Sequence, residues 1–292
     1  MEWNLAKDFG KASSRATARE KDSSEKLVHL EFMRIVACFL VIVNHTGESL
    51  FREREPGVTW FIGLIYFFIC KIAVPLFLMI SGAILLEKMD SPRKSVQRIL
   101  KNGIPFLIAS IGYYIYYGVK SETPISILDF FLRFLQSQRT NAFWYFYLYL
   151  GLLCLLPILQ KMVKALNKRD LQWIIFLSVD LLGTISLLRL FFPSFGISGY
   201  FTGALFSTYI GIYLCGCYVE QYIHLNQRKF AFASILFVAL IGFQVIATFY
   251  FYQKDPEKYL FLDNRLLITI TLSAFCFYIM IKYCFIKFPI HP

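Results

Sequence analysis

Long apolar runs separated by short polar segments dominate the hydrophobic pattern of this chain. A membrane-spanning helix needs about 20 largely apolar residues, and eight stretches of the sequence meet or approach that length. They cover roughly residues 30–50, 61–87, 104–119, 143–160, 171–191, 200–219, 230–252 and 264–285. The third stretch is short and gives the weakest signal. The pattern predicts an all-α, polytopic integral membrane helical bundle with about eight transmembrane helices.

The first 29 residues lack an apolar run and mix acidic, basic and hydroxyl side chains. This segment is too long and too polar for the start of a secretory signal, and no cleavage signal follows it. We therefore expect residues 1–29 to form a disordered cytosolic tail and residues 30–292 to form one membrane domain.

The basic residues predict the orientation of the chain in the membrane. If the N-terminus is inside, the inner segments carry 19 Lys and Arg residues and the outer segments carry nine. Cytosolic loops are enriched in Lys and Arg, so we expect a cytosolic N-terminus and, after eight spans, a cytosolic C-terminus. The net charge of +11 is then a topology signal. It indicates the lipid bilayer or a phosphorylated cytosolic substrate as partner, and no nucleic acid.

One inner segment, residues 88–103, predicts a short helix of its own. Asp90 or Ser91 is placed to cap it, and Pro92 suits its first position. Gly103 and Pro105 are expected to end it. Its Lys and Arg residues predict a basic amphipathic helix on the cytosolic surface.

Four polar residues, Glu31, Arg34, His45 and Glu48, fall within a 100° arc of the first predicted span. Arg34 and His45 lie about 16 Å apart along the axis, which is half the hydrocarbon thickness. Ionisable side chains in a span normally face the bundle interior or a wet cavity. The alternative is that Glu31 and Arg34 are interfacial and His45 only fills space.

His45 is the one histidine of four that lies inside a predicted span. A neutral imidazole can take a proton from a hydroxyl near neutral pH, so His45 is a candidate general base. Glu48 is expected either to orient it or to be solvated. Lys71, in the second span, lies at a similar depth and is expected either to stabilise an oxyanion or to pair with Glu48.

Two further features of the spans remain open to two interpretations each, and a third favours one interpretation. Asp180 is either a pathway residue or a partner in an interhelical hydrogen bond. Trp144, Tyr145 and Tyr147 form either an interfacial belt or an acceptor-binding surface. Ser81-Gly82 suits close helix packing and does not resemble a nucleophile elbow.

Together these segments resemble the membrane-bound acyltransferase type 3 family. The first span has Leu30-Glu31 followed by Arg34 and, after ten residues, His45; the family usually has Asp where Glu31 stands. The second span is similar to a family segment through Val74-Pro75-Leu76-Phe77 and Ser81-Gly82. Residues 143–159 and the basic helix before Pro105 are also similar, so the resemblance covers roughly residues 28–285.

The resemblance implies acyl transfer from acyl-CoA, with acetyl expected, to hydroxyls of cell-surface carbohydrates in the plasma membrane. By position, His45 matches the catalytic histidine and Arg34 the essential arginine. Arg93 and Arg98 match the basic segment expected to hold coenzyme phosphates. No metal is expected. Because the family usually has about ten spans, the chain is expected to be truncated or divergent at its C-terminus.

Two other classes fit buried charges in a helical membrane protein. A transporter or flippase would use intramembrane Arg, His, Lys and Asp equally well. A non-catalytic membrane domain for sensing or assembly is the second rival. No pair of Gly- or Pro-broken helices repeats between the two halves of the sequence, which disfavours a transporter.

Overall fold

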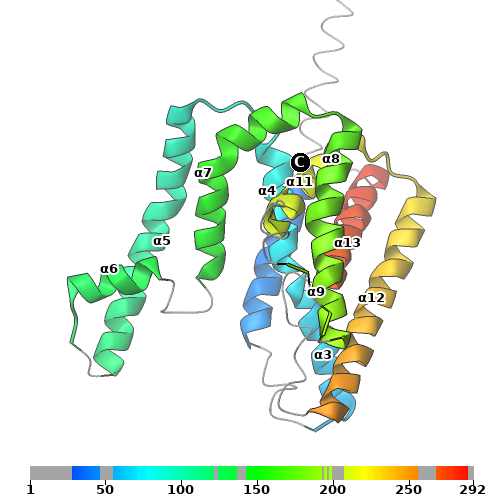
Figure 1. Cartoon of the computed structure of the whole chain (residues 1–292), viewed down its shortest axis with the longest axis horizontal. Coiled ribbons are helices and arrows are strands. Elements are labelled where there is room, and N and C mark those ends of the chain that lie inside the picture. The colour runs from blue at the N-terminus through cyan, green and yellow to red at the C-terminus, as the bar shows by residue number, and fades with distance from the viewer. Residues whose placement is uncertain are drawn as a thin grey trace, which may run out of the picture. The chain divides into compact units, whose positions relative to one another are not determined.

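The structure is a computed structural model that describes residues 28–46, 55–121, 124–136, 143–192, 194–195, 197–198, 207–255 and 268–288. These residues fold mainly into helices, with no strand among them. Most of the expected tail, and Glu48, lie outside the described residues. The elements, coloured along the chain in Figure 1, are helix Val28–Thr46, α3 (Val58–Lys71), α4 (Ala73–Leu85), α5 (Pro92–Lys120), α6 (Ile127–Leu135), α7 (Trp144–Ala165), α8 (Lys168–Ile175), the π-helical segment η1 (Phe176–Leu181), α9 (Leu182–Phe191), α11 (Thr208–Tyr222), α12 (Gln227–Lys254) and α13 (Ile268–Lys287).

Within the described residues, six helices are long and apolar enough to cross a membrane. They are Val28–Thr46, Val58–Leu85, Trp144–Ala165, Lys168–Phe191, Gln227–Lys254 and Ile268–Lys287. This confirms the predicted class, a polytopic all-α membrane protein, but not the expected count of about eight. The third predicted span lies within α5, and the sixth corresponds in part to the 15-residue α11.

Helix α5 confirms one local prediction and contradicts another. It begins after Ser91, whose Oγ accepts a hydrogen bond from the Lys94 backbone N–H at 3.4 Å, and Pro92 is its first residue. It does not end at Gly103 or Pro105 but continues to Lys120. A proline removes only one backbone donor from the helical ladder, and the apolar residues after it keep packing on α7. Membrane helices tolerate such prolines where neighbouring elements support the backbone.

The chain divides into two compact units, residues 1–83 with 172–292, called unit 1, and residues 84–171, called unit 2. In unit 1, the start of α3 packs on α12 through a cluster that includes Trp60, Phe67 and Val245. A second cluster joins helix Val28–Thr46, the junction of α3 with α4, and α13, through Leu40, Ile72 and Ala274 among others.

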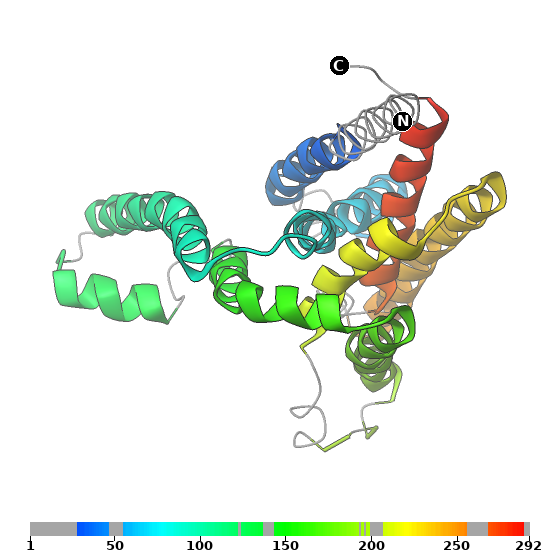
Figure 2. The same cartoon turned by 90° about the horizontal axis from the view of Figure 1, so that it is seen from above.

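Helix α11 is the buried centre of unit 1. Every residue from Gly211 to Cys217 is buried, and α11 lies beside α4 and α13 in both views (Figures 1 and 2). A Cβ on Gly82 of α4 would collide with the Tyr213 backbone, and one on Gly216 of α11 would collide with the Met79 backbone. The close helix packing predicted at Ser81-Gly82 is therefore present.

Candidate functional site

One continuous helix, Val28–Thr46, carries both Arg34 and His45. Its packed face is formed by Leu30, Met33, Ala37 and Leu40, which are buried at helical spacing. Arg34 is only half-buried and His45 is exposed, so both point away from that packed face. An unbroken helix keeps the two side chains on one side and about 16 Å apart along its axis.

Arg34 is oriented by Glu31, one turn before it. Its guanidinium Nη1 donates to both carboxylate oxygens of Glu31, at 2.7 and 2.8 Å. The two side chains remain 42% and 53% exposed. An exposed ion pair of this kind contributes only about 0–1 kcal/mol. Glu31 therefore holds the guanidinium in place without preventing it from binding another anion.

The end of the helix that carries His45 is tied to α3. The Val43 carbonyl accepts a hydrogen bond from the Tyr66 hydroxyl at 2.8 Å and another from Thr46 Oγ1 at 3.1 Å. No described residue hydrogen-bonds to His45, and the expected orienting role of Glu48 falls outside the described residues. His45 is thus held at its backbone, while its imidazole is exposed.

Asn44 is a site candidate that the sequence analysis missed. Its Oδ1 atom is buried and accepts no hydrogen bond from the described residues. A buried amide oxygen without a donor is costly unless a ligand or water supplies one. The available signal was a single amide directly before His45 in an apolar run, which is weak by itself.

Lys71 lies at a break in the second span. The helix is interrupted at Ile72, between α3 and α4, because Pro75 has no N–H to donate to the Lys71 carbonyl. The Lys71 ammonium lies back over the Phe67 ring, 4.4 Å from its centroid, in a cation–π contact.

The packing around this break gives the depth of Lys71. Its neighbours Cys70 and Ile72 belong to the cluster that contains Leu40. Leu40 lies between Arg34 and His45 on the first helix, five residues before His45, or about 8 Å along the axis. Lys71 is therefore at a depth between the two, and its contact with Phe67 does not decide between oxyanion stabilisation and a structural role.

A buried ionic network joins three helices of unit 1. The Glu220 carboxylate, only 2% exposed, lies 3.2 Å from His29 Nε2 and 3.1 Å from Lys282 Nζ. The Tyr278 hydroxyl donates to it at 2.8 Å. This network ties the start of helix Val28–Thr46 to α11 and α13. Nothing local in the sequence pairs His29 with Glu220, which lies 191 positions further along the chain, so the sequence alone does not identify this network.

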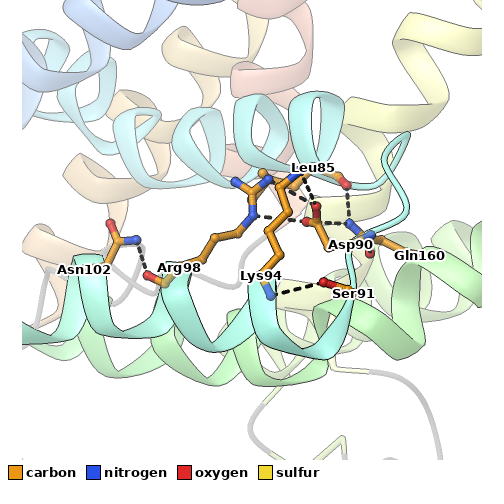
Figure 3. Close-up of polar contacts among 7 residues, drawn as sticks. All are labelled: Leu85, Asp90, Ser91, Lys94, Arg98, Asn102 and Gln160. Atoms are coloured by element: carbon orange, nitrogen blue, oxygen red, sulfur yellow. Dashed lines mark hydrogen bonds and ion pairs between the residues drawn. The ribbon is translucent and has the colours of Figure 1, made fainter.

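In unit 2, a second network involves one of the two predicted coenzyme contacts (Figure 3). Asp90, whose side chain is fully buried, accepts from Arg98 Nε at 3.0 Å and pairs with Lys94 at 3.1 Å. Gln160 of α7 donates to the Leu85 carbonyl at 2.8 Å and to Asp90 at 3.2 Å. Arg98 is therefore partly neutralised, whereas Arg93 is exposed at the start of α5.

Burial raises the pKa of Asp90, but hydrogen bonds from Lys94, Arg98 and Gln160 outweigh it and hold that pKa below the ordinary value. Asp90 is therefore a carboxylate at neutral pH. The stability that its ion pairs contribute is present at neutral pH and is lost only as the pH falls below the ordinary carboxyl range.

Asp180 lies half-buried in η1, the π-helical segment of the span Lys168–Phe191. No described residue hydrogen-bonds to it, so the interhelical bond considered for it is not formed by the described part of the chain. Segments of π-helix often accompany functional sites, and the role of Asp180 as a pathway residue stays a prediction.

The comparisons with known proteins identify the family. A family model described as an acyltransferase domain matches residues 27–287. Searches of curated proteins and of solved structures each returned no significant match. The matched region contains all of unit 2, most of unit 1 and every site residue discussed above. With Arg34 and His45 on one face of the first span, the chain belongs to the membrane-bound acyltransferase type 3 family.

Proposed function

We propose that this membrane protein transfers an acyl group, acetyl in the simplest case, from acyl-CoA to a hydroxyl of a cell-surface carbohydrate in the plasma membrane. The observation that carries the proposal is the face shared by Arg34 and His45 on one unbroken helix of a family-matched chain. The arginine binds anions at one depth, and the imidazole exchanges protons about 16 Å further along.

His45 is the proposed general base. It takes the proton of the acceptor hydroxyl while that oxygen attacks the thioester carbonyl carbon. The carbon–sulfur bond then breaks, and the sulfur leaves as the coenzyme thiol with the proton that His45 returns. A covalent acyl-histidine followed by transfer to the hydroxyl gives the same products. Lys71, at a depth between Arg34 and His45, is the proposed cation that stabilises the tetrahedral oxyanion.

Arg34 is the proposed phosphate ligand for the coenzyme in unit 1. A guanidinium already oriented by Glu31 loses little freedom when it binds a phosphate, and it offers a planar pair of donors. In unit 2, Arg93 and Arg98 are the proposed further phosphate contacts, with the Arg98 guanidinium held by Asp90. Glu48 is proposed to orient His45.

The test replaces His45 and measures transfer directly. Purified protein in nanodiscs is supplied with acetyl-CoA and a carbohydrate acceptor, and release of the coenzyme thiol is followed together with acceptor acylation. His45→Ala and His45→Gln are each expected to lower turnover by about 10²–10⁴-fold. Coenzyme binding is expected to be unchanged, because the coenzyme phosphates are assigned to Arg34, Arg93 and Arg98.

A matched control is His224→Gln, since His224 is exposed in the short segment before α12 and is expected to leave turnover unchanged. Glutamine keeps a hydrogen-bonding group of similar size but does not shuttle a proton. Near-normal turnover in the His45→Gln protein would make His45 structural and remove the mechanism. Absence of any transfer or thioester cleavage by the unsubstituted protein would favour the transporter or the non-catalytic domain.

A further inference from the structure

Helix α6, Ile127–Leu135, presents one strongly apolar face without a covering element among the described residues of unit 2. Five large side chains cover an arc of about 140° on this nine-residue helix and are at least half exposed. They are Ile127, Leu128, Phe131, Leu132 and Leu135, with exposed fractions of 79, 69, 51, 50 and 75%. We call these five residues the apolar face of α6.

A second side of α6, next to its apolar face, is packed on α5 and α7 through aromatic rings. The Phe130 ring lies 5.4 Å from that of Tyr114 on α5. The Phe134 ring lies 5.4 Å from Phe106 on α5 and 5.6 Å from Tyr147 on α7. Because this side is fixed by three ring contacts, α6 is not free to turn its apolar face inward.

Polar contacts fix the same orientation. The Tyr114 hydroxyl accepts from the Ser126 backbone N–H at 3.0 Å and donates to the Asp129 carboxylate at 2.9 Å. Asp129 also accepts from Arg133 Nε at 2.6 Å. This ion pair lies on a third side of the helix, separate from the packed rings and from the apolar face. The helix therefore has a packed side, a charged side and an apolar side.

The position of α6 along α5 and α7 corresponds to a membrane interface. Its ring contacts lie beside the start of α7, where Phe143 packs on Phe106 and Tyr113. Figure 1 shows α6 crossing α5 near that end instead of continuing it. Exposed tyrosines of α5, at positions 113, 116 and 117, lie at the same end. Aromatic side chains concentrate where lipid headgroups meet hydrocarbon.

We propose that α6 is an in-plane membrane helix whose apolar face is covered by lipid at the interface. The neighbouring α5 also exposes Ile108, Ile111 and Ile115, an apolar surface that bilayer hydrocarbon covers in a membrane protein. An amphipathic helix in the interface buries its apolar side at the acyl boundary and keeps its charges among the headgroups. Asp129 and Arg133 supply that charged side. The assignment does not depend on acyl-transfer chemistry.

Site-specific photocrosslinking in native membrane vesicles tests this assignment on the full chain. The photoreactive residue p-benzoylphenylalanine is placed at Leu128 or at Leu135 on the apolar face. The matched control position is Gln136, which is exposed and lies outside the arc of the apolar face. After irradiation, adducts are identified by mass spectrometry. We expect lipid adducts at Leu128 and Leu135 in severalfold excess over Gln136.

Two results would overturn the proposal. Crosslinks from the apolar face to another segment of this chain, or to a second copy, would show that protein covers it. Equal lipid yields at all three positions, or no lipid adducts at any, would show that the face does not lie against lipid. If a Leu128 substitution prevents folding, as judged by size-exclusion chromatography, Ile127 on the same face replaces it in the comparison.

Discussion

At the scale of single residues, two ion pairs involve the start of the first helix, Arg34–Glu31 and His29–Glu220. They occupy different environments and suit different tasks. The Arg34–Glu31 pair is about half exposed, so exchange of Glu31 for a phosphate costs little. Glu220 is buried among His29, Lys282 and Tyr278, and removal of one member of such a pair typically costs about 3–5 kcal/mol. Ligand binding is therefore expected at Arg34, and helix anchoring at Glu220.

Replacement of Arg34 tests its role as a coenzyme ligand. Loss of a charge-assisted hydrogen bond typically costs about 1.5–3 kcal/mol, so Arg34→Ala is expected to weaken coenzyme A binding by roughly 10–100-fold. Arg34→Lys is expected to recover only part of that loss, since a point charge lacks the planar fork. Isothermal titration calorimetry on purified protein measures both affinities.

Two controls accompany the Arg34 experiment. Glu31→Gln removes the competing carboxylate and keeps the guanidinium, so affinity is expected to stay the same or to increase. Arg228→Ala removes an exposed charge at the start of α12 and is expected to leave affinity unchanged. Equal affinity in the Arg34→Ala and unsubstituted proteins would exclude Arg34 as the phosphate ligand.

At the scale of elements, the crossing of α4 and α11 depends on two glycines. Gly82 and Gly216 each face the backbone of the other helix, with no room for a Cβ. Close approach of small residues stabilises helix pairs in membranes through van der Waals packing. The same crossing positions α4, which directly follows the break at Lys71, so the glycines also help to place a candidate site residue.

Alanine at either glycine is expected to force the two helices apart. Overpacking typically costs about 1–3 kcal/mol, so Gly82→Ala and Gly216→Ala are each expected to lower the apparent Tm of the detergent-purified protein. Gly112→Ala and Gly242→Ala are the matched controls, because a Cβ there would meet nothing within 4 Å. Both controls are helical and are expected to be neutral or to gain up to about 1 kcal/mol. Equal Tm values in both groups would contradict the close crossing.

At the scale of the whole molecule, the family match from residue 27 to residue 287 covers all of unit 2 and most of unit 1. Unit 2 contains one helix that is long and apolar enough to span a membrane, Trp144–Ala165, and unit 1 contains most of the others, so both units are expected to be embedded in the bilayer. The family domain is thus larger than either unit. Neither unit contains all the proposed functional residues, since His45 belongs to unit 1 and Arg93 to unit 2.

The orientation of the molecule is tested with reporter fusions. The excess of Lys and Arg in the segments expected to be inside predicts that both termini are cytosolic. Green fluorescent protein fused after Lys26 and, separately, after Lys287 is expected to fluoresce in cells. Alkaline phosphatase at the same positions is expected to be inactive. Active phosphatase at one terminus alone would require an odd number of spans, and at both termini it would reverse the orientation.

The sequence by itself determined the properties that depend on residues near one another in the chain. The alignment of Arg34 with His45 follows from helical periodicity, and the start of α5 follows from Ser91 and Pro92. Long apolar runs established the membrane class. Close helix packing at Gly82 was also predicted, although the sequence did not indicate which helix packs there.

Only the tertiary structure decided the features that depend on distant residues. Glu220 pairs with His29 across 191 positions, and Asp90 pairs with Gln160 across 70, so no local pattern identifies either contact. The continuation of α5 through Pro105 was likewise missed, because packing on α7 outweighs the loss of one backbone hydrogen bond. Local spacing sets which side chains share a helix face, whereas burial and ion pairing depend on which helices the fold brings together.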